Sequence, residues 1–136
     1  MRKRKGFTLM ELIIVVIIIG ILAMIGLPQY FKTTERARMA EALDTLGAIR
    51  SAELRFSMSN GAGNSTAVWN DLDIDEIPAT TNFAAPALTG GQACSGTTDT
   101  VVASIARASK TAAYTVAISC SGKLTCTDGT CPPLPQ

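Results

Sequence analysis

Apolar and polar residues divide the 136-residue chain into stretches of different periodicity. Residues 12–27 carry no charged or polar side chain, and residues 7–10 extend the apolar run. Together they approach the roughly 20 residues that a helix needs to cross a bilayer. The exception is Glu11, because a carboxylate at the edge of such a segment costs about 2–3 kcal/mol to insert unless it is paired.

Residues 33–59 have the pattern of an amphipathic helix. Apolar side chains recur at three- and four-residue steps and predict one buried face, formed by Met39, Leu43, Leu46, Ile49 and Phe56. Charged side chains, Glu53 among them, are expected mostly elsewhere. One helix over 7–59 would be roughly 80 Å long. It is expected to kink near Pro28, which cannot donate a backbone hydrogen bond, and to end at the glycines of 60–65.

The stretch 66–93 is predicted to be a connecting loop in which Trp69 covers the core. Apolar residues alternate with acidic ones there, which predicts a short strand or turn around Leu72, Ile74 and Ile77. Its carboxylates, Asp71, Asp73, Asp75 and Glu76, favour a solvated acidic face over a calcium site, because the turn glycine and distal glutamate of a calcium loop are missing. Residues 64–66 form a glycosylation sequon.

The C-terminal third has the alternation of β-strands. Residues 100–106, 111–120 and 123–126 are predicted as three antiparallel strands, with turns at 108–110 and 121–122. The amphipathic helix would cover this sheet, and 132–136 would be an extended tail.

Charge and composition restrict the function. The net charge is +1, but residues 1–6 hold four of the twelve basic side chains, so the rest carries eight against eleven acidic ones. That balance argues against a general nucleic-acid surface, and the basic residues 2–5 should hold the N-terminus in the cytoplasm. Without histidine or a nucleophile or phosphate-loop motif, neither an enzyme nor a cofactor is expected.

The four cysteines follow the apolar run and would lie on the exported side of the membrane. An even count in an oxidising compartment predicts two disulfides. Zinc is disfavoured because the spacings contain no Cys-x-x-Cys. The short loop 127–130 favours Cys126–Cys131, which leaves Cys94–Cys120, although three pairings are possible.

The run of residues 4–12, Arg-Lys-Gly-Phe-Thr-Leu-Met-Glu-Leu, resembles the N-terminal motif of type IV prepilins and related pseudopilins. The resemblance implies cleavage by a prepilin peptidase after Gly6 and N-methylation of Phe7. It also implies that Glu11 pairs with the N-terminal amine of a neighbouring subunit. Assembly would use Thr8, Glu11, Gly20 and Pro28, and the segment 20–28 unwinds in several filaments of this family.

By this resemblance the fold is α+β: a long N-terminal helix on a small antiparallel sheet, with a disulfide-bounded C-terminal region. The expected parts are a leader (1–6), an apolar helix half (7–30), an amphipathic half (31–60) and a globular remainder (61–136). The chain would be an inner-membrane protein, N-terminus in the cytoplasm, which then polymerises with identical subunits into an extracellular pilus. A cytoplasmic ATPase acting through a membrane platform protein would drive extraction from the membrane.

Three alternatives remain on sequence grounds. A type II secretion pseudopilin usually has a Tyr-Pro near the end of the long helix and an Asp-Pro-Trp-Gly-like segment, and this chain has neither. A membrane-anchored exported binding module would explain the apolar run but not Gly6 and Glu11. A cleaved secretory signal is disfavoured because the run is long and no small-residue cleavage site follows it.

Overall fold

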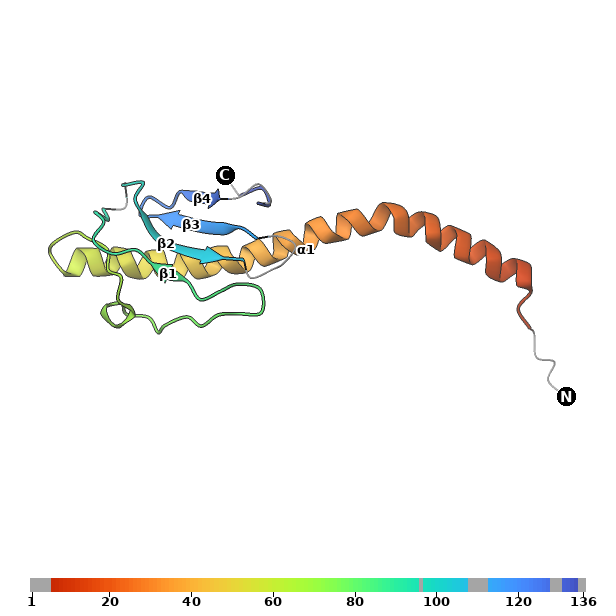
Figure 1. Cartoon of the computed structure of the whole chain (residues 1–136), viewed down its shortest axis with the longest axis horizontal. Coiled ribbons are helices and arrows are strands. Elements are labelled where there is room, and N and C mark those ends of the chain that lie inside the picture. Colours follow the sequence, from red (N-terminus) through yellow and green to blue (C-terminus); the bar gives the residue numbers. More distant parts are fainter. Residues whose placement is uncertain (1–5, 96, 108–112, 128–130, 135–136) are drawn as a thin grey trace. The chain divides into compact units, whose positions relative to one another are not determined.

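The computed structural model describes residues 6–95, 97–107, 113–127 and 131–134. The helices are α1 (Leu9–Ser59) and a 3-10 turn, η1 (Trp69–Asp71). The strands are β1 (Ala87–Leu88), β2 (Val101–Ala106), β3 (Thr115–Ser119) and β4 (Leu124–Thr127) (Figure 1). Packing divides the chain into two units, Met1–Glu35 and Arg36–Gln136.

In the first unit the chain from Leu9 onward is helical, and α1 runs without interruption across Pro28. Within the described residues, α1 is the one helix long and apolar enough to cross a membrane, and its apolar window has a mean hydropathy of 2.9. None of that window is buried in the molecule. The helix here is therefore specified by its own apolar sequence, because no packing against other described residues of the molecule supports it.

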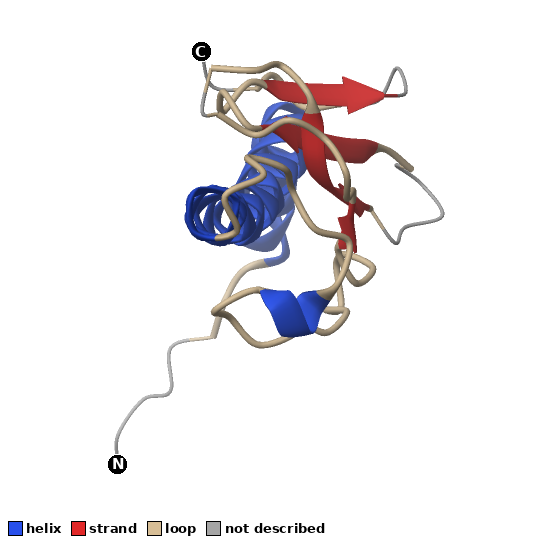
Figure 2. Cartoon of the chain, turned by 90° about the vertical axis from the view of Figure 1, so that its left-hand side faces the viewer, coloured by secondary structure: helices blue, strands red, loops and turns tan. Residues whose placement is uncertain are grey.

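In the second unit α1 packs beside an antiparallel sheet with strand order β1-β2-β3-β4 (Figure 2). The core joins Met39, Ala42, Leu46 and Ile49 of the helix to apolar side chains of β2 and β3. This arrangement confirms the α+β fold expected from the sequence.

The two central strands are buried more completely than strict alternation would give. Val102 and Ala103 are consecutive, and both have no exposed surface. The pairing of β2 with β3 shifts register between Val101 and Ala103. Such a bulge turns two successive side chains toward one face, so β2 places two neighbouring side chains, Val102 and Ala103, in the core.

The structure corrects several sequence-based expectations. The sheet has four strands rather than three, because β1 lies inside the stretch predicted to be loop. Residues 72–77 contain no strand; the 3-10 turn η1 precedes them, and Leu72 is the buried residue among the three apolar ones. Phe56 is only half-buried and lies outside the core cluster. The expected turn at 108–110 lies outside the described residues.

Glu53 is the most unexpected core residue, because the helical pattern placed it off the apolar face and its side chain is fully buried. One carboxylate oxygen, Oε2, accepts the backbone N–H of Thr66 at 3.0 Å. The other, Oε1, has no hydrogen-bond partner. Burial raises the pKa of Glu53 against the lowering effect of this hydrogen bond, and the negative charge of Asp71 raises it further.

Glu53→Gln is expected to stabilise the folded chain at pH 7 by about 1 kcal/mol, because glutamine can accept the same N–H without a buried charge. A raised pKa means that the folded chain holds the proton more tightly than the unfolded chain. The wild-type contribution is therefore full below the unfolded pKa and is lost as pH rises through the folded pKa. The free energy of urea unfolding, followed by Trp69 fluorescence in detergent, should diverge between the two proteins over that rise.

Glu53→Ala is the matched control, since it leaves the Thr66 N–H without an acceptor and should cost about 2 kcal/mol. A stability difference between Glu53→Gln and wild type that stays constant with pH would show that Glu53 does not titrate as described.

Candidate functional site

The apolar surface of the first unit is the principal candidate for a binding surface. Its large hydrophobic side chains are exposed along the whole helix, from Leu9, which is 76% exposed, to Phe31, which is 61% exposed. Exposed apolar patches of this size mark contacts with a membrane or another protein. The surface therefore needs lipid or a partner to cover it.

The residues at the predicted cleavage position precede this helix. Gly6, Phe7 and Thr8 have no regular secondary structure, and Phe7 is 81% exposed. An accessible backbone outside regular secondary structure is what a peptidase needs in order to reach a peptide bond. The geometry is thus compatible with cleavage after Gly6.

Thr8 and Glu11 together begin the helix. The Thr8 Oγ1 accepts the backbone N–H of Glu11 at 3.3 Å, as an N-cap side chain does. Glu11 lies in the first turn, where a carboxylate gains about 0.3–1 kcal/mol from the helix dipole. Thr-x-x-Glu is the capping-box spacing, so the sequence itself carries a local signal for this helix start. Glu11 consequently has a modest role within its own chain, far smaller than the cost of burying its charge.

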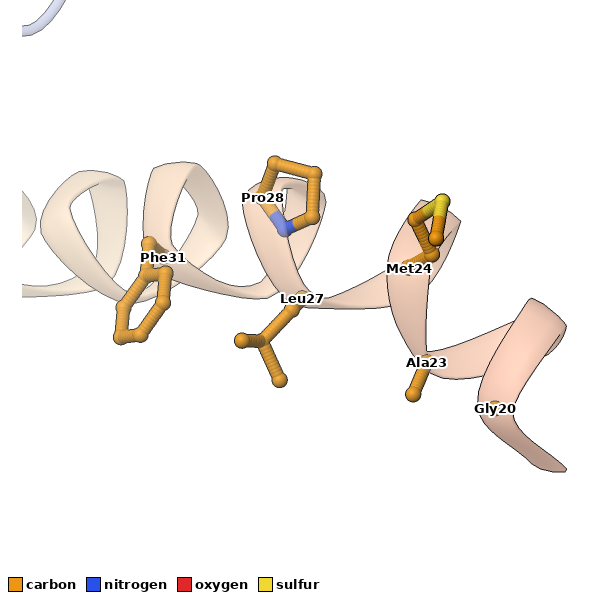
Figure 3. Close-up of a pocket in the computed structure, with 6 residues that line it drawn as sticks. All are labelled: Gly20, Ala23, Met24, Leu27, Pro28 and Phe31. Atoms are coloured by element: carbon orange, nitrogen blue, oxygen red, sulfur yellow. The ribbon is translucent and has the colours of Figure 1, made fainter. Parts of the chain in front are cut away.

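Gly20 and Pro28 border a hollow of about 510 Å³ on the helix, completed by Ala23, Met24, Leu27 and Phe31 (Figure 3). A Cβ added at Gly20 would meet no atom within 4 Å, so its own chain does not require glycine there. Pro28 offers no N–H to the carbonyl of Met24, four residues earlier. The hollow thus lies along the segment in which a glycine and a proline weaken the helix.

The structure contains two disulfides in the second unit, Cys94–Cys120 and Cys126–Cys131. The first is buried in the core, and its Cα atoms are 5.3 Å apart. Two side chains of α1 hold it: Arg50 donates through Nε to the Cys120 carbonyl, and Ser57 donates through Oγ to the Cys94 carbonyl, both at 2.8 Å. The periodicity of the helix gave no indication of these two contacts.

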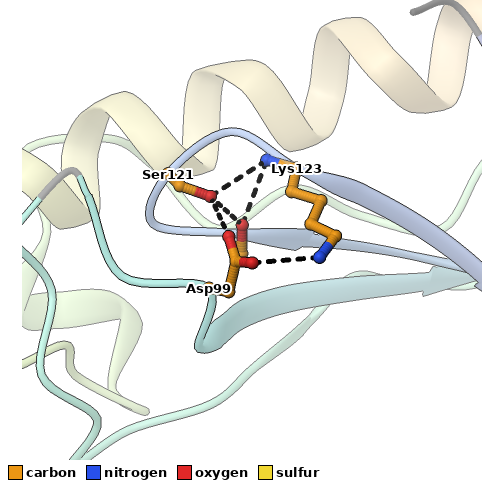
Figure 4. A network of polar contacts seen from close by, with 4 residues as sticks. Asp99, Ser121 and Lys123 are labelled. Carbon is orange, nitrogen blue, oxygen red and sulfur yellow. Dashed lines mark hydrogen bonds and ion pairs between the residues drawn. The ribbon is translucent and has the colours of Figure 1, made fainter.

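A polar network lies at the turn between β3 and β4 (Figure 4). Ser121 Oγ donates to Asp99 at 2.6 Å, and the Lys123 ammonium forms an ion pair with the same carboxylate at 2.9 Å. The Ser121 hydrogen bond, followed by that from Lys123, lowers the pKa of Asp99. The lysine and the aspartate are both exposed, so the network fixes a surface turn and offers no enclosed site for chemistry.

The four acidic residues of 71–76, Asp71, Asp73, Asp75 and Glu76, are all exposed. Asp73 forms a bidentate ion pair with Arg55, with Nε–Oδ2 at 2.6 Å and Nη2–Oδ1 at 2.7 Å. The hydrogen bonds from Arg55 are the main cause of the lowered pKa of Asp73. In the described part of the chain, no group of three or more histidine, cysteine, aspartate or glutamate residues is arranged to hold a metal ion.

In the glycosylation sequon of residues 64–66, Asn64 is exposed, while the Thr66 hydroxyl donates a hydrogen bond to Asp71.

Comparison with known proteins extends these observations. A family model described as the prokaryotic N-terminal methylation motif matches residues 1–27. A fimbrial protein of Pseudomonas aeruginosa is 40% identical over 75 residues, covering 55% of this chain and 49% of that protein. The type IV narrow pilus major component of Thermus thermophilus is 34% identical over 85 residues, covering 52% of this chain and 73% of that protein. No solved structure matches the chain at a significant level.

The motif and the fold together define a protein with an apolar N-terminal helix leading into a small α+β globule. The chain belongs to the type IV pilin family, as the 34% identity over nearly three quarters of a pilus component shows. It spans about half the length of the Pseudomonas fimbrial protein that it matches.

Proposed function

We propose that this chain is the major subunit of a type IV pilus, a filament that serves adhesion, motility or DNA uptake. The observation that carries the proposal is the apolar helix of the first unit, whose surface is exposed along its whole length. The curated relatives support it, since they are named fimbrial proteins and pilus components. A pseudopilin of type II secretion is the second candidate from the sequence, and those names favour the pilus.

Processing comes first in this scheme. The basic residues 2–5 keep the leader in the cytoplasm while the helix is held in the inner membrane. A prepilin peptidase cuts after Gly6, and Phe7 becomes the methylated N-terminus. The new amine carries a positive charge at the edge of an apolar segment, close in sequence to the carboxylate of Glu11.

Assembly follows from the cost of these charges. An unpaired carboxylate in lipid is unfavourable, but it becomes tolerable beside a cation that shares its low-dielectric surroundings. Pairing Glu11 of one subunit with the amine of Phe7 in its neighbour satisfies both groups. It also selects one axial register, since a shifted neighbour would leave both charges unpaired.

Extraction of the helix from the membrane requires work. The described residues show no nucleotide-binding loop, and the sequence contains no such motif. An assembly ATPase acting through an inner-membrane platform protein would supply that work. The segment between Gly20 and Pro28, which carries the hollow of Figure 3 on its surface, is where the helix can unwind at least cost as subunits pack.

The experiment is to shear the surface of the native host and test the released material for this chain by electron microscopy and immunoblotting. Wild-type chain should appear in filaments. Gly6→Val should remain in the membrane fraction with its leader attached, because a β-branched residue cannot replace glycine beside the cut bond. The control is Gly47→Ala, a substitution at a helical glycine remote from the leader where an added Cβ meets no atom within 4 Å, which should leave cleavage unchanged. Wild-type chain found only in membranes would overturn the proposal.

A further inference from the structure

The two ends of helix α1 within the second unit carry complementary apolar features. At the far end Met58 is 77% exposed, and Val68, in the loop that follows, is 51% exposed. Among the described residues from Arg36 onward, these are the only large hydrophobic side chains with such exposure. A methionine held out in water at the end of a rigid helix is suited to insertion into a partner, because its unbranched side chain adapts to irregular cavities.

At the near end of the same helix there is an apolar groove of about 360 Å³, hereafter the helix–tail groove. Four residues of α1 and two of the C-terminal segment line it: Arg36, Met39, Ala40, Leu43, Pro133 and Leu134. Met39 forms its buried floor, and Leu43 and Leu134 pack against the core. Its apolar lining and its size can accommodate one long side chain.

The two ends of α1 within the second unit also differ in charge. Arg36 lies on the wall of the groove and forms no ion pair with a described residue, and no carboxylate is among the groove's described lining residues. At the opposite end, Asp71 and Asp73 border a second hollow beside Arg55 and Phe56. Asp75 and Glu76 follow within a few residues and are exposed. At this hollow the single guanidinium of Arg55 is thus set against the two carboxylates of Asp71 and Asp73, which leaves a net negative charge beside the last turn of α1.

We propose that Met58 of one copy inserts into the helix–tail groove of a second copy, with the acidic segment 71–76 facing Arg36. This inference rests on the proposed filament function and names one of its contacts. Because Met58 and the helix–tail groove lie at opposite ends of α1 within the second unit, the contact is head-to-tail and propagates as an open chain of subunits. Met58 lies nineteen residues beyond Met39, so contacting copies should be displaced by about 29 Å along the helix direction.

The test is an engineered cross-link between the two surfaces in assembled filaments. Ala40→Cys combined with Met58→Cys should give a ladder of dimers and higher oligomers when sheared filaments are run on a non-reducing gel. Each single variant should run as a monomer. The matched control is Ala48→Cys with Met58→Cys, because Ala48 is exposed on the same helix but lies outside the groove. The control should show at least tenfold less cross-linked product.

Filaments that form without a ladder, or with equal cross-linking in the control pair, would overturn this contact and leave the filament function standing. Absence of the unmodified chain from sheared filaments would instead overturn the function itself. If the cysteine variants do not assemble, imaging of unmodified filaments decides the matter. Met58 should then lie against Met39 and Leu43 of a copy about 29 Å away, and any other location for Met58 would contradict the inference.

Discussion

Replacing Glu11 by glutamine is expected to reduce the amount of sheared filament by at least about tenfold while the processed chain remains in the membrane. Removal of one partner of a buried ion pair typically costs about 3–5 kcal/mol, because the other charge is left uncompensated. The uncompensated charge here would be the N-terminal amine of the neighbouring Phe7. Immunoblots of the sheared and membrane fractions measure both quantities.

Glutamine isolates the charge from the local role of Glu11. A glutamine three residues after an N-cap threonine can still serve in a capping box, so the helix start is preserved. Thr8→Ala is the complementary control: it removes the acceptor of the Glu11 N–H at a cost of about 1 kcal/mol but keeps the charge. Its filaments should persist at more than half the wild-type amount. Equal losses in both variants would mean that the helix start, rather than the charge, is what matters.

Removal of the Cys94–Cys120 disulfide should have the second large effect. The double substitution Cys94→Ala with Cys120→Ala is expected to lower the free energy of unfolding by about 3.5 kcal/mol in the chain-entropy estimate, since the bond spans 26 residues. Both residues are buried, and each backbone carbonyl accepts a hydrogen bond from α1. Urea unfolding of the full chain in detergent, followed by Trp69 fluorescence, measures the loss.

The second disulfide provides the comparison. Cys126 and Cys131 are only five residues apart, and the same estimate gives about 2 kcal/mol for their removal. Both lie at the half-buried edge of the core. If losing Cys126–Cys131 costs as much as losing Cys94–Cys120, the longer loop closed by the first disulfide is not what makes it the more stabilising of the two.

The helix was the most predictable element, because its signals are local and strong. The uncharged run of 12–27 and the glycine-rich stretch after Ser59 define its extent, and the structure ends α1 at Ser59 as expected. Asn60 completes that end by accepting the backbone N–H groups of Ala62 and Gly63, and Gly61 and Gly63 have positive φ. Sequence patterns work here because caps and turns depend on nearby residues.

The missed features all depend on tertiary contacts. β1 has only two residues, too few for any alternation, and it exists because Ala87 and Leu88 pair with Ser104 and Ala103. Glu53 is buried because the returning loop brings the Thr66 N–H to its carboxylate. The helix–tail groove needs Pro133 and Leu134, nearly a hundred residues from Arg36 in sequence, to lie beside it. Periodicity along the chain carries no information about such distant partners.

The central claim, that this pilin is processed and exported as a filament subunit, is tested most directly by the intact mass of the chain in sheared filaments, measured with and without reduction. The account predicts a chain that starts at methylated Phe7. Its non-reduced mass should be about 4 Da below the reduced mass, because two disulfides lack four hydrogens. A chain that retains Met1, or that never leaves the membrane fraction, would contradict it.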